Sequence, residues 1–222
     1  AEYYKPHEDE FVHIIQGVTL GRFIRGIHYW GAMAMIVLVG LHLLRVFVSG
    51  SFKRPREGNW TFGVALAAIT GGLFFSGTVI KWDQEALEAL NHNVEIAKLL
   101  GKFGFWFSPT FGGTPLLSRL YVVHIAVLPA LFTFAIAVHL MLVKFHGMAP
   151  SPFRHDHGEP EPTERFTRHL TRLACYGLML LAVLFVLAAL IPPGIGHAPV
   201  AGLEVPKHSW PLRRAYPIEA VV

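Results

Sequence analysis

The segment from Arg25 to Arg45 is long and apolar enough to cross a membrane, and it carries two histidines, His28 and His42. On a helix, their interval of fourteen residues brings both rings to within about 40° of one face and separates them by about 21 Å in depth. Because the hydrocarbon core of a bilayer is about 30 Å thick, one imidazole is expected near each membrane surface.

The composition of the whole chain is typical of a membrane protein. Of its 222 residues, 53% are hydrophobic and only 15% are charged, whereas soluble domains average about 25% charged residues. The net charge is a modest +4 and the basic residues gather in loops, which indicates membrane topology and no nucleic-acid partner. The single cysteine, Cys175, excludes an intrachain disulfide and a Cys-x-x-Cys-His site for a c-type haem.

Four membrane spans are expected, at about residues 21–48, 60–80, 117–143 and 173–191. The chain is therefore predicted to be an all-α membrane protein, a transmembrane helical bundle. We divide it into a bundle over residues 1–150 and a second part over 151–222, which holds a polar loop, the fourth span and a proline-rich tail.

The basic loops at 49–59 and 144–172 are placed on the cytoplasmic (n) side by the positive-inside rule. The connection over residues 81–118 then faces the opposite (p) side, and it is expected to contain a short helix over about 85–100.

The third span carries a second pair of histidines, His124 and His139, fifteen residues apart on roughly one helix face. Since the first and third spans run in the same direction, His28 is expected level with His124, and His42 level with His139. Two pairs of facing imidazoles at two depths predict two bis-histidine haems stacked between the helices. Zinc is disfavoured because its ligands converge on one point. Packing contacts, or a histidine proton relay in a transporter or channel, are the alternatives.

Two further pairs of residues fit this arrangement. Gly63 and Gly77 in the second span repeat the fourteen-residue interval, and a missing side chain lets a porphyrin approach the backbone, although glycine is common in membrane helices. Arg25 and Arg45 flank the histidines of the first span, where haem propionates need cationic partners; snorkelling to the membrane surface is the alternative.

A haem iron with two axial imidazoles passes electrons and has no free position for oxygen. Any chemistry is therefore expected where the chain meets a reductant or oxidant in the membrane. A lipid-soluble quinone is the natural candidate.

Several motifs together closely resemble the cytochrome b of bc-type quinol-oxidising complexes. The likeness covers about residues 3–150 and rests, besides the four histidines and two glycines, on His42-x-x-Arg45, Phe52-Lys53-Arg54-Pro55-Arg56-Glu57, Trp82-Asp83-Gln84, Ser118-Arg119-Leu120-Tyr121 and His146-Gly147. The interval of fifteen in the third span resembles the short, split form of the cytochrome b–f and Gram-positive menaquinol complexes.

The resemblance implies two non-covalent b haems, a low-potential p-side haem on His28 and His124 and a high-potential n-side haem on His42 and His139. In this family quinol is oxidised on the p side, where one electron goes to a Rieske iron–sulfur protein and then to a c-type cytochrome. The other crosses both haems and reduces quinone on the n side, which builds a proton gradient. A dimeric complex in a bacterial-type cytoplasmic, energy-transducing membrane is implied, with a second chain that carries a Pro-Glu-Trp-Tyr quinol-site segment.

The chain departs from the family pattern in places. The family has a membrane helix before the polar opening, and here the sequence starts after it; Lys81 replaces a proline at the border of the p-side quinol pocket. These departures motivate an alternative, a dihaem b-type membrane anchor that connects an extracytoplasmic dehydrogenase or multihaem partner to the quinone pool without quinol bifurcation.

Three weaker site candidates lie near the expected quinone sites: Asp83, Lys144 and His146. For Asp83, capping of the helix that follows is the slightly favoured interpretation. For Lys144 and His146, a lipid-facing charged loop is nearly as well supported as quinone binding. An extra n-side haem is conceivable at Cys175, but an apolar core cysteine is the favoured expectation.

Overall fold

The structure is a computed structural model, and it describes residues 17–99, 101–107, 111–147 and 166–194. The described part is helical without strands, and four of its helices are long and apolar enough to cross a membrane. They are α2 (Gly21–Val48), α3 (Glu57–Ile80), a continuous span over Leu116–His146, and α7 (Phe166–Leu190). The all-α membrane bundle predicted from the sequence is confirmed, with helix ends that shift by up to seven residues, the largest shift being at the start of α7.

The third span consists of three consecutive helical pieces. They are α5 (Leu116–Val122), a single π-helical turn η4 (Val123–Val127) and α6 (Leu128–His146). The sequence predicted a single span over about residues 117–143, so the π turn within it is a difference from that expectation.

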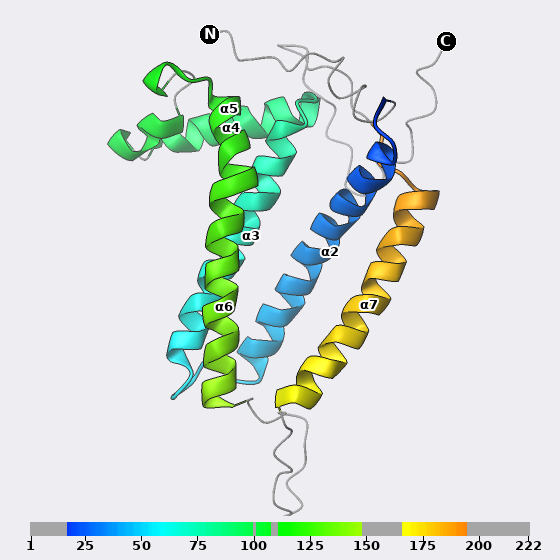
Figure 1. Cartoon of the computed structure of the whole chain (residues 1–222). Coiled ribbons are helices and arrows are strands. Elements are labelled where there is room, and N and C mark those ends of the chain that lie inside the picture. The colour runs from blue at the N-terminus through cyan, green and yellow to red at the C-terminus, as the bar shows by residue number, and fades with distance from the viewer. Residues whose placement is uncertain (1–16, 100, 108–110, 148–165, 195–222) are drawn as a thin grey trace, which may run out of the picture.

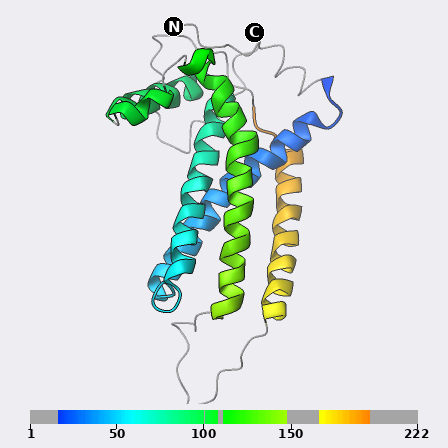
Figure 2. The same cartoon turned by 60° about the vertical axis from the view of Figure 1, so that its left-hand side comes forward.

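The four spans are arranged as two closely packed pairs, α3 with α6 and α2 with α7. Figures 1 and 2 show α2 crossing the molecule at an angle, between α7 and the pair formed by α3 and α6. α2 and α7 approach closely at Gly26, where an added Cβ would lie 3.0 Å from the Cβ of Ala188. Small residues at such crossings let membrane helices pack through their backbones.

One end of the bundle is covered by the connection between the second and third spans. It contains the amphipathic helix α4 (Gln84–Leu99) and two short 3-10 helices, η2 (Gly101–Phe107) and η3 (Phe111–Gly113), which lie across the top in Figure 1. The expected helix over 85–100 is confirmed. Its buried side packs on a small core of residues: Val79, Trp82, Leu90, Leu116, Leu117 and Leu120.

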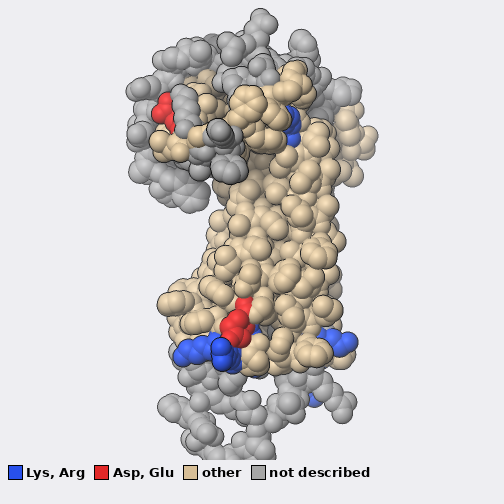
Figure 3. All heavy atoms as spheres, turned by 90° about the vertical axis from the view of Figure 1, so that its left-hand side faces the viewer, with Lys and Arg blue, Asp and Glu red and all other residues tan. Residues whose placement is uncertain are grey.

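The opposite end carries the basic loop between α2 and α3. Figure 3 shows Lys and Arg gathered at this end, below an uncharged middle section. Within the loop Arg54 Nε lies 3.1 Å from Glu57 Oε1, and Arg56 Nε donates to the carbonyl of Gly147 at the end of α6 at 3.3 Å. This distribution agrees with the expected n side here and p side at α4. The proline-rich tail and most of the 144–172 loop lie outside the described residues.

Candidate functional site

The structure brings the four histidines together in the two pairs expected from the sequence. The ring centroids of His28 and His124 are 6.0 Å apart, and those of His42 and His139 are 6.4 Å apart. The ring planes within each pair are nearly perpendicular, at 78° and 74°. Each pair joins α2 to the third span, so these rings line the space where the two helices face each other.

The separation within each pair fits a single metal ion held between two imidazoles. A metal–nitrogen bond is about 2.0 Å long, and the bonded nitrogen lies about 1.1 Å from the centre of its ring. Two imidazoles on opposite sides of one metal ion therefore have ring centroids about 6.2 Å apart. The observed 6.0 and 6.4 Å bracket this value. Among the described residues, no group of three or more His, Cys, Asp or Glu side chains could hold a metal. Each pair could therefore supply two nitrogen ligands to one ion, which would suit a haem iron better than tetrahedral zinc.

The histidines of the third span are oriented by hydrogen bonds to acceptors on α3. His139 Nδ1 lies 3.2 Å from the carbonyl oxygen of Asn59, and His124 Nδ1 lies 3.0 Å from the hydroxyl of Ser76. Because a carbonyl only accepts, His139 carries its proton on Nδ1 and leaves the lone pair of Nε2 free. A second hydrogen-bond partner of this kind is what fixes the orientation of metal-binding histidines.

The two glycines of α3 lie directly against these rings. A Cβ at Gly77 would be 2.9 Å from His124 Cε1, and one at Gly63 would be 3.4 Å from His139 Cε1. The sequence suggested that the glycines face porphyrins, and the structure adds that they make room for the histidine rings themselves. Contact of the glycines with a porphyrin stays a prediction.

The π turn explains why intervals of fourteen and fifteen residues produce equivalent pairs. In it, the N–H of Leu128 donates to the carbonyl of Val123, five residues earlier. The π turn accommodates one extra residue. The angle about the helix axis between His124 and His139 therefore equals that of two residues fourteen apart in a regular α-helix. Pro129, at the start of α6, supplies the physical reason: proline has no N–H to donate and its ring clashes with the carbonyl four residues before it.

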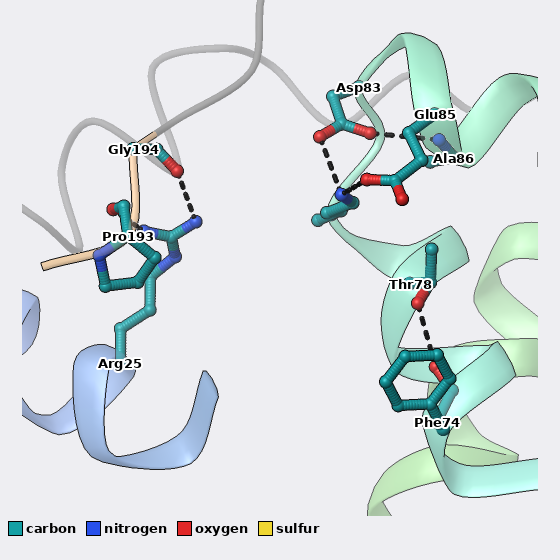
Figure 4. A network of polar contacts seen from close by, with 9 residues as sticks. Arg25, Phe74, Thr78, Asp83, Glu85, Ala86, Pro193 and Gly194 are labelled. Atoms are coloured by element: carbon teal, nitrogen blue, oxygen red, sulfur yellow. Dashed lines mark hydrogen bonds and ion pairs between the residues drawn. The ribbon is translucent and has the colours of Figure 1, made fainter. Parts of the chain in front are cut away.

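Arg25 is engaged by the segment that follows α7. Its Nη1 donates to the carbonyl of Pro193 at 2.8 Å and its Nη2 to that of Gly194 at 3.0 Å (Figure 4). Trp30 Nε1 donates to the carbonyl of Ile191 at 2.9 Å. These three carbonyls belong to the segment directly after α7, so the bonds tie the exit of α7 to α2.

The propionate partners expected for the two arginines stay predictions. A guanidinium has five N–H groups, and two of those of Arg25 are used by the α7 exit. Arg45 is exposed one turn beyond His42.

Asp83 acts as the N-cap of α4, which confirms the favoured interpretation of this residue. Its Oδ1 accepts the N–H of Ala86 at 2.9 Å (Figure 4). Its Oδ2 lies 3.0 Å from Lys81 Nζ, and Lys81 also bonds Glu85. Burial by itself lowers the pKa of Lys81, but the hydrogen bond to Glu85 and the charge of Asp83 outweigh it and raise that pKa above its ordinary value.

The remaining candidates lie near the expected n side. His146 Nδ1 donates to the carbonyl of Leu142 in its own helix at 3.0 Å, and Lys144 is exposed. Their part in quinone binding stays a prediction. Cys175 is exposed, so the expectation of a core cysteine is wrong. The reason is helical phase: α7 packs on α2 around Ala188, and thirteen residues place Cys175 about 140° away from that contact.

Comparison with known proteins agrees with this geometry. The family model described as cytochrome b(N-terminal)/b6/petB matches residues 33–199, a range that includes α7. The menaquinol:cytochrome c reductase cytochrome b subunit of Geobacillus thermodenitrificans is 35% identical over 147 residues, which cover 63% of this chain and 66% of that protein. The chain thus spans just under two thirds of that relative's length.

Two other relatives carry related names. Cytochrome b6 of Heliobacterium modesticaldum is 35% identical over 162 residues, 67% of this chain and 74% of that protein. The cytochrome bc complex cytochrome b subunit of Chlorobaculum thiosulfatiphilum is 31% identical over 154 residues, 66% of this chain and 36% of that protein. With its matched range and its two histidine pairs, the chain belongs to the cytochrome b (N-terminal)/b6 family of multi-pass membrane proteins.

Proposed function

We propose that the chain is the transmembrane electron-transfer subunit of a quinol–cytochrome c, or similar acceptor, oxidoreductase. The observation that carries this proposal is the pair of imidazole sites, with centroid separations of 6.0 and 6.4 Å, at two depths of one bundle. Membership of the cytochrome b family implies haem b. The name of one relative, a menaquinol:cytochrome c reductase cytochrome b subunit, favours a quinol as the electron donor.

Two non-covalent b haems would be held by the chain's own residues. His28 and His124 would hold the p-side haem iron, and His42 and His139 the n-side haem iron. When bound, haem b supplies a one-electron redox centre. Ser76 and the Asn59 carbonyl hold two of the ligand rings in the tautomer that presents Nε2, and the glycines of α3 leave the rings room to lie close to that helix.

The p-side and n-side ends of the bundle are the proposed places of quinone chemistry. At the p side, the short α4 segment and the network of Lys81, Asp83 and Glu85 would border the quinol pocket. At the n side, Lys144 and His146 are the candidates for quinone contact. A Rieske iron–sulfur protein, a c-type cytochrome and a chain with the Pro-Glu-Trp-Tyr segment are the proposed partners, in a bacterial cytoplasmic membrane.

Oxidant-induced reduction tests this function against the dihaem anchor. Membranes that contain the assembled complex are poised with excess quinol while reoxidation of the n-side haem is blocked by an inhibitor. If quinol oxidation is bifurcated, a pulse of oxidant to the c-type cytochrome draws one electron away and forces the other onto the b haems, so their α-band absorbance rises. In an anchor without bifurcation the same pulse leaves the haems unchanged or oxidises them. A colourless purified chain would contradict both functions and favour a proton relay.

A further inference from the structure

The two ligand histidines of the third span are held by acceptors of different kinds. His139 donates to a backbone carbonyl, that of Asn59 at 3.2 Å, which is present whatever side chain stands at that position. His124 faces the side-chain hydroxyl of Ser76 at 3.0 Å. A backbone acceptor, Leu73, also bonds His124, so the p-side ring has one partner that depends on the identity of a residue and one that does not. Within the described part of the chain, the n-side ring has the backbone partner alone.

The donor in the contact between Ser76 and His124 follows from counting protons. Ser76 Oγ lies 2.7 Å from the carbonyl of Gly72 and 3.2 Å from that of Leu73, and both of these groups only accept. A hydroxyl has one proton, and the bonds to its own helix use it. Its oxygen lone pairs are left for His124, so the histidine donates from Nδ1 and keeps Nε2 free for a metal.

The surroundings leave this arrangement little freedom. Ser76 is 1% exposed, so water does not compete for its oxygen. The next residue, Gly77, brings the α3 backbone so close that even a Cβ there would lie 2.9 Å from the His124 ring. The His124 ring is therefore held against α3 by the hydroxyl of Ser76 and by close contact with the backbone of Gly77.

We propose that Ser76 is a positioning residue for His124 that lowers the midpoint potential of the p-side haem without affecting the n-side haem. The inference rests on the proposed function, because it assumes that Nε2 of His124 binds iron. A hydrogen bond that His124 donates from its Nδ1–H raises the electron density of the imidazole, which makes it a better ligand for the oxidised iron. Loss of the bond therefore favours the reduced haem.

The test is a redox titration of both b haems in the full chain, purified with its haems, for wild type, Ser76→Ala and Ser76→Thr. Thr70→Ala is the matched control, since Thr70 is also buried on α3 and donates to the carbonyl of Leu66 at 2.8 Å. In the described part of the chain, no hydrogen bond joins Thr70 to any of the four histidines.

Ser76→Ala is expected to raise the reduced-to-oxidised ratio of the p-side haem at fixed potential by up to about tenfold, which equals about 59 mV for one electron. The n-side midpoint should not move, Thr70→Ala should change neither haem, and Ser76→Thr should return the p-side value toward wild type. Selective loss of the p-side haem in Ser76→Ala, restored by Ser76→Thr, also supports the proposal.

An unshifted p-side midpoint in Ser76→Ala, or equal changes at both haems, would overturn the role of Ser76 alone. A wild-type chain that lacks two haems would instead overturn the proposed function. The two failures are therefore told apart in the same experiment.

Discussion

Gly77→Ala is the smallest substitution expected to disturb one histidine pair and spare the other. The new Cβ would lie 2.9 Å from His124 Cε1, a distance that real Cβ atoms essentially never show, whereas ordinary contact begins at 3.4 Å. The ring must therefore move away from α3 by about 0.5 Å. That movement also strains the hydrogen bond between His124 Nδ1 and the hydroxyl of Ser76.

The cost can be scaled from other overpacked sites. Forcing a methyl group into a filled site costs about 1–3 kcal/mol, which corresponds to about a 5- to 150-fold loss of p-side haem affinity. The helix itself should not suffer, because alanine is about 1 kcal/mol more favourable than glycine inside a helix. The expected variant is a folded chain that loses its p-side haem first.

The assay counts haem per purified chain by pyridine haemochrome while a haem-binding competitor is titrated. Gly71→Ala is the matched control, because it lies on the same helix and an added Cβ there meets nothing within 4 Å. Gly63→Ala, where the contact would be 3.4 Å, should have a small effect, confined to the n-side haem. Equal retention of both haems in Gly77→Ala and Gly71→Ala would refute the reasoning.

Three further predictions address other parts of the molecule. Deleting Ile125 together with Pro129→Ala should turn the third span into a regular helix with an interval of fourteen residues from His124 to His139, and haem counting should still find two haems per chain. Deleting Ala137 instead leaves the π turn in place and rotates the two histidines apart, so this variant should lose a haem. Trp30→Phe removes the bond to the end of α7 and should lower the free energy of unfolding by about 1 kcal/mol at unchanged haem content, measured by thermal melting in detergent; a lowered haem content would contradict it. Because the folded-state pKa of Lys81 is raised, its stabilisation is present below the ordinary lysine pKa of about 10.4 and lost as pH rises through the folded pKa. The melting temperature of the wild type should therefore fall as the pH becomes alkaline, and that of Lys81→Met should fall less. Curves of melting temperature against pH that run parallel for the two proteins would contradict this.

The sequence predicted the features that depend on regular periodicity. The lengths of the apolar segments predicted the four membrane spans. The fourteen-residue interval in α2 predicted the depths of its two histidines and the helix face that they share. The pairing of His28 with His124 followed from topology alone, and the 6.0 Å between their rings agrees with it. The N-cap role of Asp83 followed from its place just before a helix, because capping depends on local sequence.

The features that sequence reasoning missed depend on partners far apart in the chain or on backbone geometry. The contact of Ser76 with His124 joins residues 48 positions apart, and a serine among apolar residues of a span gave no sign of it. The bonds from Arg25 to the α7 exit span more than 160 residues. The π turn did have a signal in Pro129, but proline predicts an irregular turn without specifying its type.

The central claim, that each histidine pair holds one non-covalent haem, is tested most directly by counting haem in the purified chain and in two single variants. Acid–acetone extraction and pyridine haemochrome analysis should give two extractable b haems per wild-type chain. His124→Ala should retain the n-side haem alone, and His139→Ala the p-side haem alone, each with its own midpoint potential. One haem or none in the wild-type chain, or a wild-type count in either variant, would contradict the claim.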